Sequence, residues 1–279
     1  MSNDSKVWLI TGSSTGFGRT LAETVLESGD KVIATARKPE QLEDLISKYP
    51  QTAIALKLDV TNPDEIIVAI EKANAAFGRI DVLVNNAGYG LIGALEEVSD
   101  EQIHRNFDTN LFGAINVIRA VLPMMRRQQS GHIINMSAIA GFTNELGFSI
   151  YGGAKFALEG VSEALQGEVA PLGIKVTIVE PGPFRTDFIR RSLDRAEEQM
   201  EAYQGSVGKF LNFLNNIEGK QPGDPAKAAE AIIKVINSEN PPLRLVLGKY
   251  AYTKFRKKIE SLKTELDKWE AVSANTDFE

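Results

Sequence analysis

The sequence predicts an α/β fold: a doubly wound parallel sheet of about seven strands, flanked by helices. Short apolar runs alternate with longer amphipathic stretches, which is typical of parallel strands joined by right-handed crossover helices. The runs are apolar at successive positions, which indicates strands that are covered on both faces. The expected strands are Val7–Ile10, Lys31–Ala36, Ile54–Asp59, Val82–Asn85, His132–Ser137, Lys175–Glu180 and Leu243–Leu247.

Helices are expected between these strands. The first follows Val7–Ile10 directly, because Leu21, Val25 and Leu26 form one apolar face. The other helical patterns are Gln41–Lys48, Pro63–Phe77, Asp100–Arg127, Tyr151–Ala170 and Pro225–Ile236. No internal repeat, linker or low-complexity segment interrupts this order. Residues 1–279 are therefore expected to form a single domain, with a lid insertion at about 184–223 and a C-terminal helical tail at about 249–279.

Composition excludes several classes of function. The chain has 279 residues, 43% of them apolar, and its formal net charge of -6 argues against a nucleic-acid or anionic-membrane surface. It has no cysteine, which excludes disulfides, thiolate catalysis and thiolate metal sites, and no metal is expected. The polar start, Met1–Lys6, does not resemble a signal peptide, and no apolar run approaches the ~18 residues of a membrane span. We expect a cytoplasmic protein.

A glycine-rich turn, Thr11-Gly12-Ser13-Ser14-Thr15-Gly16-Phe17-Gly18, follows the first strand. Such a turn lets the backbone approach a pyrophosphate, and the following helix offers free N–H groups at its N-terminus. The alternative is an ordinary turn with three glycines, but a strand directly before and a helix directly after favour nucleotide binding. The motifs at the carboxyl ends of the strands, where ligands bind such sheets, are Gly12, Arg37, Asp59, Asn86, Ser137 and Pro181.

Tyr151 and Lys155 lie four residues apart in a helical pattern, so that a phenol and an ammonium share one helix face. A phenol titrates near ~10, and a nearby cation lowers its pKa. Because a general acid or base works best near the operating pH, the pair is a candidate proton-transfer device. Alone, this spacing also arises by chance on helix surfaces.

Five motifs together resemble the short-chain dehydrogenase/reductase family in order and spacing. They are Thr11-Gly12…Gly16-x-Gly18, Asn85-Asn86-Ala87-Gly88, Ser137, Tyr151-x-x-x-Lys155 and Pro181-Gly182. The resemblance covers about residues 5–248 and implies a Rossmann-like fold. The sequence departs from the family at Gly152-Gly153, where relatives more often carry Ser and Ala. We expect these glycines to permit the close approach of a helix or a ligand.

The resemblance implies four catalytic residues: Asn110, Ser137, Tyr151 and Lys155. Tyr151 would protonate the developing alkoxide, and Ser137 would donate a hydrogen bond to the same oxygen. Lys155 would lower the pKa of Tyr151 and bind the nicotinamide ribose. Asn110 would hold a water that resupplies the proton; the alternative is a helical Asn in a polar pocket.

The cofactor contacts also follow from the resemblance, which places Asp59 and Val60 at the adenine. Asn86, Ala87 and Gly88 would line the ribose, whereas Asn85 would brace the sheet. The full set of expected cofactor-binding residues is Gly12, Ser14, Thr15, Gly16, Phe17, Gly18, Arg37, Asp59, Val60, Asn86, Ala87, Gly88, Tyr151, Lys155, Pro181, Gly182, Phe184 and Thr186.

The end of the second strand favours NADP(H) over NAD(H). An NAD site usually has a carboxylate there, but this strand ends in Thr35-Ala36-Arg37-Lys38. A guanidinium can form a fork of hydrogen bonds to a 2′-phosphate. The alternative is that Arg37 and Lys38 are solvated loop cations.

The expected function is NADP(H)-dependent hydride transfer to or from a small-molecule carbonyl or secondary alcohol. Two alternatives stay open: a non-catalytic nucleotide-sensing protein on the same fold, and an epimerase or dehydratase with bound cofactor. The lid residues suggest a lipophilic or aromatic substrate, although they could simply pack on the core. They are Phe188, Leu193, Met200, Tyr203, Phe210, Leu211, Phe213 and Leu214.

The tail carries apolar residues at steps of three and four, which predict one apolar helix face. They are Tyr252, Phe255, Ile259, Leu262, Leu266 and Trp269. Large exposed apolar patches are rare, so the helix is expected to pack against the domain, near the lid or a subunit boundary. A homodimer is expected, because relatives often associate through the helices that carry Asn110 and Tyr151.

Overall fold

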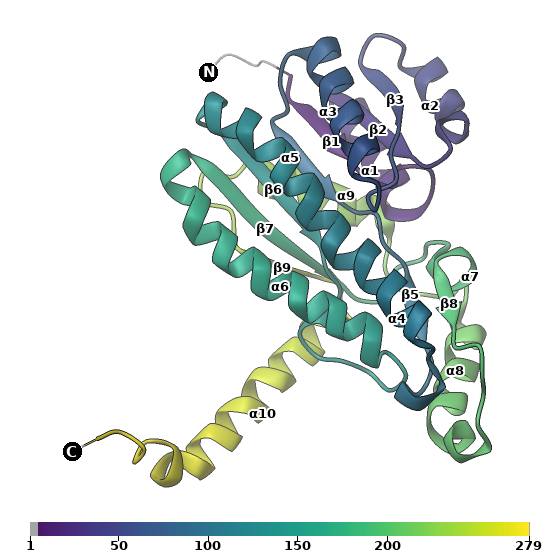
Figure 1. The fold of residues 1–279 in the computed structure, drawn as a ribbon, viewed down its shortest axis with the longest axis vertical. Coiled ribbons are helices and arrows are strands. Elements are labelled where there is room, and N and C mark those ends of the chain that lie inside the picture. The colour runs from purple at the N-terminus through teal and green to yellow at the C-terminus, as the bar shows by residue number, and fades with distance from the viewer. Residues whose placement is uncertain (1–4, 279) are drawn as a thin grey trace.

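The computed structural model describes residues 5–278, so Met1–Asp4 and Glu279 lie outside the described residues. Seven parallel strands form the main sheet, in the order β3-β2-β1-β4-β6-β7-β9 (Figure 1). The strands are β1 Val7–Ile10, β2 Lys31–Ala36, β3 Ala53–Lys57, β4 Val82–Asn85, β6 Gly131–Met136, β7 Ile174–Pro181 and β9 Arg244–Leu247. The order runs outward in both directions from β1 and β4, which confirms the predicted doubly wound parallel sheet, a Rossmann-like fold.

Helices cover both faces of this sheet. Successive strand residues point to opposite faces, so in β1 Trp8 packs with α1 and α9 while Leu9 packs with α3, α5 and α6. The helices are α1 Gly16–Glu27, α2 Glu43–Lys48, α3 Pro63–Phe77, α4 Asp100–Phe107, α5 Gly113–Gln128, α6 Ser149–Val169, α7 Phe188–Arg191, α8 Lys209–Ile217, α9 Pro225–Ile236 and α10 Lys249–Ser273.

Local signals explain where several helices begin and end. The side chain of Asn62 accepts hydrogen bonds from the first-turn N–H groups of α3, and Gly78, with φ of 72°, ends this helix. Ser99 and Gln102 form the capping box that begins α4. The helix predicted over Asp100–Arg127 is interrupted, because residues 108–112 form a π-helical turn between α4 and α5.

The 184–223 segment stands beside the carboxyl ends of the strands (Figure 1). It contains α7, α8 and the short strand β8 Leu193–Arg195, which pairs in parallel with β5 Gly90–Ile92. This small second sheet is not expected from the sequence, because three-residue strands are too short to show a periodic pattern.

The tail prediction is right about the helix and wrong about its packing. Only the base of α10 touches the domain: Ala251 is buried against Gly182, and the Phe255 ring stacks on Phe142. Beyond this base the helix projects away from the body (Figure 1). Leu266 and Trp269 are 66% and 54% exposed. The direction in which the chain leaves β9 determines this course, and among residues 5–278 no other element covers the apolar face beyond Phe255.

No helix among residues 5–278 combines the length and the apolar character that a membrane crossing requires.

Candidate functional site

The glycine-rich turn is tied to the end of β4. Asn86 Nδ2 donates to the Thr11 and Gly12 carbonyls at 2.8 and 3.1 Å. The backbone N–H groups of Asn86 and Ala87 donate to Thr11 Oγ1 at 2.9 and 3.0 Å. A Cβ at Gly18 would lie 2.4 Å from Asn86 Nδ2, so the turn needs a glycine there. The Asn86 side chain thus holds the turn in shape, in line with its expected support of the neighbouring strand, and its contact with a ribose stays a prediction.

The segment after β7 lies against the same turn. The rings of Phe17 and Phe184 are 5.1 Å apart, and a Cβ built at Gly16 would meet only Thr186, at 3.8 Å. Gly12 and Gly16 have φ values of 67° and 58°, a backbone region that favours glycine. The fold therefore brings together two groups of predicted site residues that are far apart in the sequence.

The ends of β2 and β3 complete this edge of the sheet. Ser13 N donates to Thr35 O at 2.8 Å, which places the end of β2 beside the glycine-rich turn. Arg37 is exposed two residues further on. One carboxylate oxygen of Asp59 accepts from the N–H and hydroxyl of Thr61, at 3.0 and 2.7 Å.

Tyr151 and Lys155 are both buried in the first turns of α6, with 7% and 5% exposed. Lys155 Nζ lies 5.8 Å from the centroid of the Tyr151 ring and donates to Met136 O at 2.8 Å. Burial raises the pKa of Tyr151 above its usual value and lowers the pKa of Lys155 to about 8. Burial accounts for the raised pKa of Tyr151, and the expected lowering of this pKa by Lys155 stays a prediction. Tyr151 therefore carries its proton at neutral pH.

Asn110 lies in the π-helical turn and is 1% exposed. Its Nδ2 donates to the Tyr89 and Asn106 carbonyls at 2.9 and 3.0 Å. A Cβ at Gly88 would lie 2.5 Å from Asn110 Oδ1 and 3.5 Å from Lys155 Nζ. Asn110 and Lys155 therefore face the same glycine, and π-helical turns are frequent at functional sites.

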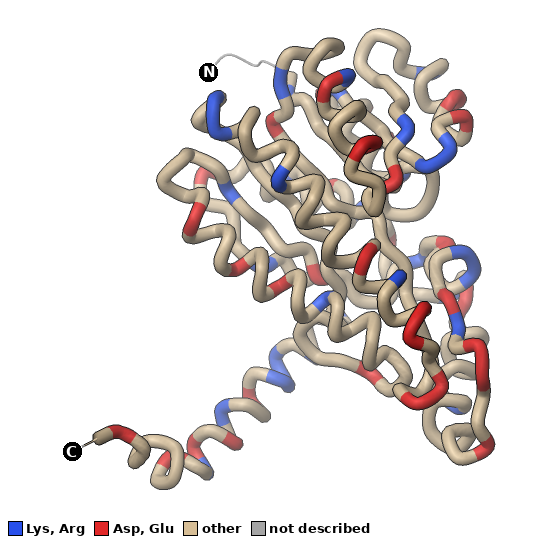
Figure 2. Tube along the Cα trace, in the orientation of Figure 1, with Lys and Arg blue, Asp and Glu red and all other residues tan. Residues whose placement is uncertain are grey.

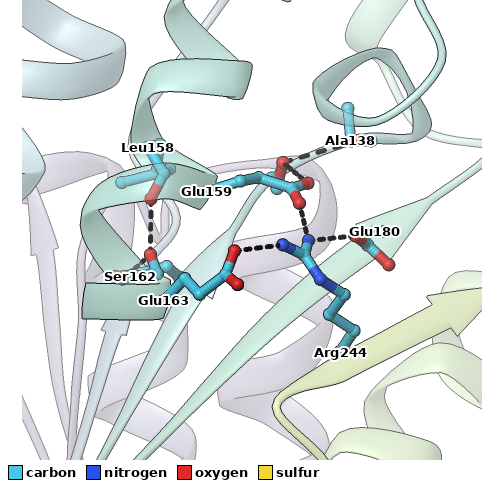
Figure 3. Close-up of polar contacts among 9 residues, drawn as sticks. Ala138, Leu158, Glu159, Ser162, Glu163, Glu180 and Arg244 are labelled. Atoms are coloured by element: carbon cyan, nitrogen blue, oxygen red, sulfur yellow. Dashed lines mark hydrogen bonds and ion pairs between the residues drawn. The ribbon is translucent and has the colours of Figure 1, made fainter. Parts of the chain in front are cut away.

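Ser137 connects the site to a largely buried charge network that was not expected from the sequence. Its hydroxyl donates to Glu159 Oε1 at 2.7 Å. Glu159 pairs with Arg244, which also contacts Glu180 at 3.0 Å and Glu163 at 3.1 Å (Figure 3). A hydroxyl has one proton, so Ser137 must turn from Glu159 in order to donate elsewhere.

Glu180 is the most deeply buried carboxylate of this network, with 0% exposed. Burial raises its pKa to about 7, and its Oε2 has no hydrogen-bond partner among the described residues. One signal for the network was present in the sequence. Glu159 falls four residues after Lys155 on the same helix face, a charge where an apolar residue would be expected.

Asn85 braces the sheet as predicted, because its Nδ2 donates to Asn135 Oδ1 at 2.8 Å. The paired glycines of α6 differ from each other. A Cβ at Gly152 would lie 2.3 Å from the Asn144 side chain, whereas one at Gly153 would meet only Phe107, at 3.8 Å. Gly152 thus permits a close approach, although of a loop side chain and not of a helix.

Apolar side chains surround Tyr151. Its ring lies 5.5 Å from Phe148 and 6.0 Å from Phe188, and Phe148 contacts Phe210 edge-on at 5.8 Å. The whole cluster is Ile92, Ala138, Ala140, Phe148, Tyr151, Phe188, Ile189, Leu193, Phe210, Leu211, Leu214 and Ile217. Most of the 184–223 side chains in it come from α7 and α8.

The fold and these strand ends define a Rossmann-like α/β protein, and comparisons with known proteins give the family. Residues 6–197 match the model of the short chain dehydrogenase family. The chain is 41% identical to oxidoreductase BOA17 of Botryotinia fuckeliana over 270 residues. This match covers 96% of this chain and 98% of the relative. It is also 40% identical over 255 residues to a 3-ketodihydrosphingosine reductase of Bacteroides thetaiotaomicron, a match that covers 90% of this chain and 91% of the relative.

A solved structure agrees with these relatives. A short-chain dehydrogenase from Streptomyces avermitilis superposes with a TM-score of 0.93 at 46% identity, covering 99% of this chain and 100% of that one. The chain therefore belongs to the short-chain dehydrogenase/reductase family and is an oxidoreductase.

Proposed function

We propose that this protein is an NADP(H)-dependent oxidoreductase that transfers a hydride between the nicotinamide and a lipophilic carbonyl or secondary alcohol. The carrying observation is the position of Tyr151: a buried, protonated phenol on one helix face with Lys155, enclosed by apolar side chains. This arrangement gives a proton donor at a site that favours an apolar substrate.

The residues at the strand ends fit a dinucleotide. The positive φ values of Gly12 and Gly16 shape the turn so that its backbone could approach a pyrophosphate in the space at the N-terminus of α1. Phe184 and Thr186 border the same space and would contact the nicotinamide end. When bound, the cofactor supplies the hydride.

The side chains of the site then bind, orient and protonate. Tyr151 gives its proton to the carbonyl oxygen, and Ser137 leaves Glu159 to donate a hydrogen bond to that oxygen. Lys155 holds the cofactor ribose, and Asn110, across Gly88 from Lys155, supports the resupply of the proton. In alcohol oxidation each proton moves the other way.

Arg37 supports the choice of NADP(H). It is exposed at the end of β2, beside the glycine-rich turn, where a 2′-phosphate would lie and where an NAD site would place a carboxylate. A fork of guanidinium hydrogen bonds would select for the phosphate.

The aromatic cluster supports a lipophilic substrate. Phe148 and Phe188 flank the Tyr151 ring, so the substrate carbon next to the carbonyl would meet aromatic surface. The name of the Bacteroides relative, a 3-ketodihydrosphingosine reductase, states a keto substrate.

The experiment is a panel of ketones, from short to long chain, with NADPH or NADH as donor, followed by the loss of reduced-nicotinamide absorbance. We expect turnover with NADPH and a rise in kcat/KM with chain length. No turnover with any ketone, or with any alcohol and NADP+, would contradict the proposal. A preference for NADH would overturn the cofactor assignment alone.

A further inference from the structure

Helix α10 presents an apolar stripe that its own domain leaves largely uncovered, apart from Phe255, whose ring stacks on Phe142. The exposed fractions are 56% for Tyr252, 45% for Ile259, 45% for Leu262, 66% for Leu266 and 54% for Trp269. A single exposed leucine needs no explanation, but a continuous stripe along a helix marks an interaction surface.

The spacing of this stripe is that of a coiled coil. From Tyr252 to Trp269 the apolar residues follow one another at steps of three, four, three, four and three. This is a heptad pattern in which Tyr252, Ile259 and Leu266 occupy the a positions. The d positions are Phe255, Leu262 and Trp269. A strict seven-residue repeat keeps one seam facing a partner helix, whereas a helix packed on a domain has a broader apolar face.

The charges beside the seam differ between the two halves of the helix. The half near the domain carries Lys249, Lys254, Arg256, Lys257 and Lys258 with no acid, whereas every acid of the helix lies further out. The acids are Glu260, Glu265, Asp267 and Glu270, interspersed with Lys263 and Lys268. Figure 2 shows this change from blue near the body toward red near the C-terminus.

We propose that α10 pairs with α10 of a second copy of this chain in an antiparallel coiled coil. The stripe is symmetric about its middle, so reversal pairs Tyr252 with Trp269, Phe255 with Leu266 and Ile259 with Leu262 of the other copy. Every seam residue then meets an apolar partner, as an isologous twofold contact requires, and Leu266 of the other copy would pack beside Phe255 where this ring stacks on Phe142.

The flanking charges decide the direction. In the antiparallel pair, two contacts are of opposite charge: Lys258 meets Glu265 and Lys249 meets Glu270 of the other copy. One contact, Arg256 with Lys263, is of like charge. In a parallel pair, Lys258 would meet Lys263 and Glu265 would meet Glu270, so these flanking pairs would both be of like charge. Opposite charges on the two halves of one helix are complementary only when the second helix runs the other way.

The base of the helix is held in place for such a contact. Tyr250 Oη donates to Glu145 Oε1 at 2.8 Å, and Lys254 pairs with the same carboxylate. Leu146, the next residue, is 62% exposed. The C-terminal end of the second helix would arrive beside this base, where Leu146 would add apolar area to a short seam.

The first test measures the mass of the full chain in solution by sedimentation over a range of concentrations. Leu262→Asp places charges in both central layers of the seam, so it should halve the mass of the assembly and weaken association about a hundredfold or more. Thr264→Asp, a charge on the opposite side of the helix, is the matched control and should leave the mass unchanged. A monomeric wild type, or a mass that Leu262→Asp leaves unchanged, would overturn the proposal.

The second test fixes the direction. Lys258→Glu should weaken an antiparallel pair about tenfold, and adding Glu265→Lys should restore it. In a parallel pair, Lys258→Glu would strengthen association. Because the chain has no cysteine, Tyr252→Cys with Trp269→Cys should cross-link the copies, whereas Tyr252→Cys alone should not. Cross-linking by the single variant would overturn the antiparallel pairing.

A membrane surface is the competing partner for an amphipathic helix with a basic base. If the full chain stayed monomeric and bound phosphatidylserine vesicles in a way that Leu262→Asp abolishes, the coiled coil would be rejected. The tail variants should keep wild-type NADPH turnover, so failure here and failure of the proposed function are independent.

Discussion

Two regions of this molecule show the same pattern in the sequence and opposite outcomes in the structure. The 184–223 segment and the tail both carry large apolar side chains at helical spacing. In the first region most of these side chains pack in the cluster around Tyr151, although Phe213 stays exposed, whereas in the second Leu266 is 66% exposed. Periodicity therefore shows that a helix has an apolar face, and it does not show what covers that face. Whether that face is buried depends on where the preceding part of the chain places the helix in the fold.

The largest expected effect separates the tyrosines of the two regions. Tyr151→Phe should lower kcat by about 10²–10⁴-fold, because it removes the proton donor and keeps the ring. Tyr252→Phe should leave kcat within about twofold, since this phenol lies on the exposed stripe. The measurement is NADPH turnover, with NADPH binding followed by fluorescence. Near-normal turnover by Tyr151→Phe would reject the assigned proton donor.

Core packing gives the second contrast. Phe148→Ala should destabilise the protein by about 3 kcal/mol, because Phe148 is buried between Tyr151 and Phe210. Ile259→Ala should change the free energy of unfolding by less than about 0.5 kcal/mol, when measured by denaturant at dilutions that keep the chains apart. Equal losses would mean that the tail is covered by its own domain after all.

Arg37 is, like the tail, an exposed group that we expect to have a partner. Arg37→Asp should shift the ratio of NADPH to NADH kcat/KM about tenfold or more toward NADH, because a charge-assisted contact is replaced by repulsion. Lys38→Asp, one residue further along the loop, is the control and should have a smaller effect. An unchanged ratio in Arg37→Asp would show that Arg37 is a solvated cation.

Buried carboxylates such as Glu180 should make the stability of the body depend on pH, in contrast to the exposed charges of the tail. The pKa of Glu180 is raised from 4.5 to about 7, so the folded state binds its proton more tightly than the unfolded state. Its contribution to stability is therefore present below about pH 4.5 and is lost as pH rises to about 7.

The full shift corresponds to about 3 kcal/mol, and the ion pair with Arg244 offsets part of it. Glu180→Gln should thus remove about 1–2 kcal/mol of the decline in unfolding free energy between pH 5 and 8. The exposed neighbour Glu163→Gln should leave the decline intact. A decline that persists in Glu180→Gln would assign it to another group.

The smallest effect concerns the two glycines beside Tyr151. Gly153→Ala should stabilise the protein by about 0.5–1 kcal/mol, because a helical alanine replaces a glycine without a clash. Gly152→Ala should instead lower the melting temperature, since its Cβ would meet the Asn144 side chain. If both variants were stabilised, the Asn144 contact would be easily rearranged.

The sequence by itself determined the sheet and the edge at which the motifs lie. The apolar runs, bounded by glycine and polar residues, predicted both ends of each strand of the main sheet to within two residues. Such runs are apolar on both faces of a strand, so they must be buried on both sides. Asn86, Ser137 and Pro181 could be assigned to one edge, since the carboxyl ends of parallel strands meet there. The four expected catalytic residues were named from the resemblance of their motifs to the family, and their roles stay predictions.

Only the tertiary structure decided which groups touch. Glu159 holds the Ser137 hydroxyl, and Arg244 joins it to Glu180 across residues far apart in the chain. No local pattern encodes such contacts. The pKa of Tyr151 also depends on how deeply the fold buries the phenol, which the spacing of Tyr151 and Lys155 does not show. The course of α10 is likewise set by the direction of β9, so an apolar stripe expected to be buried is left facing solvent.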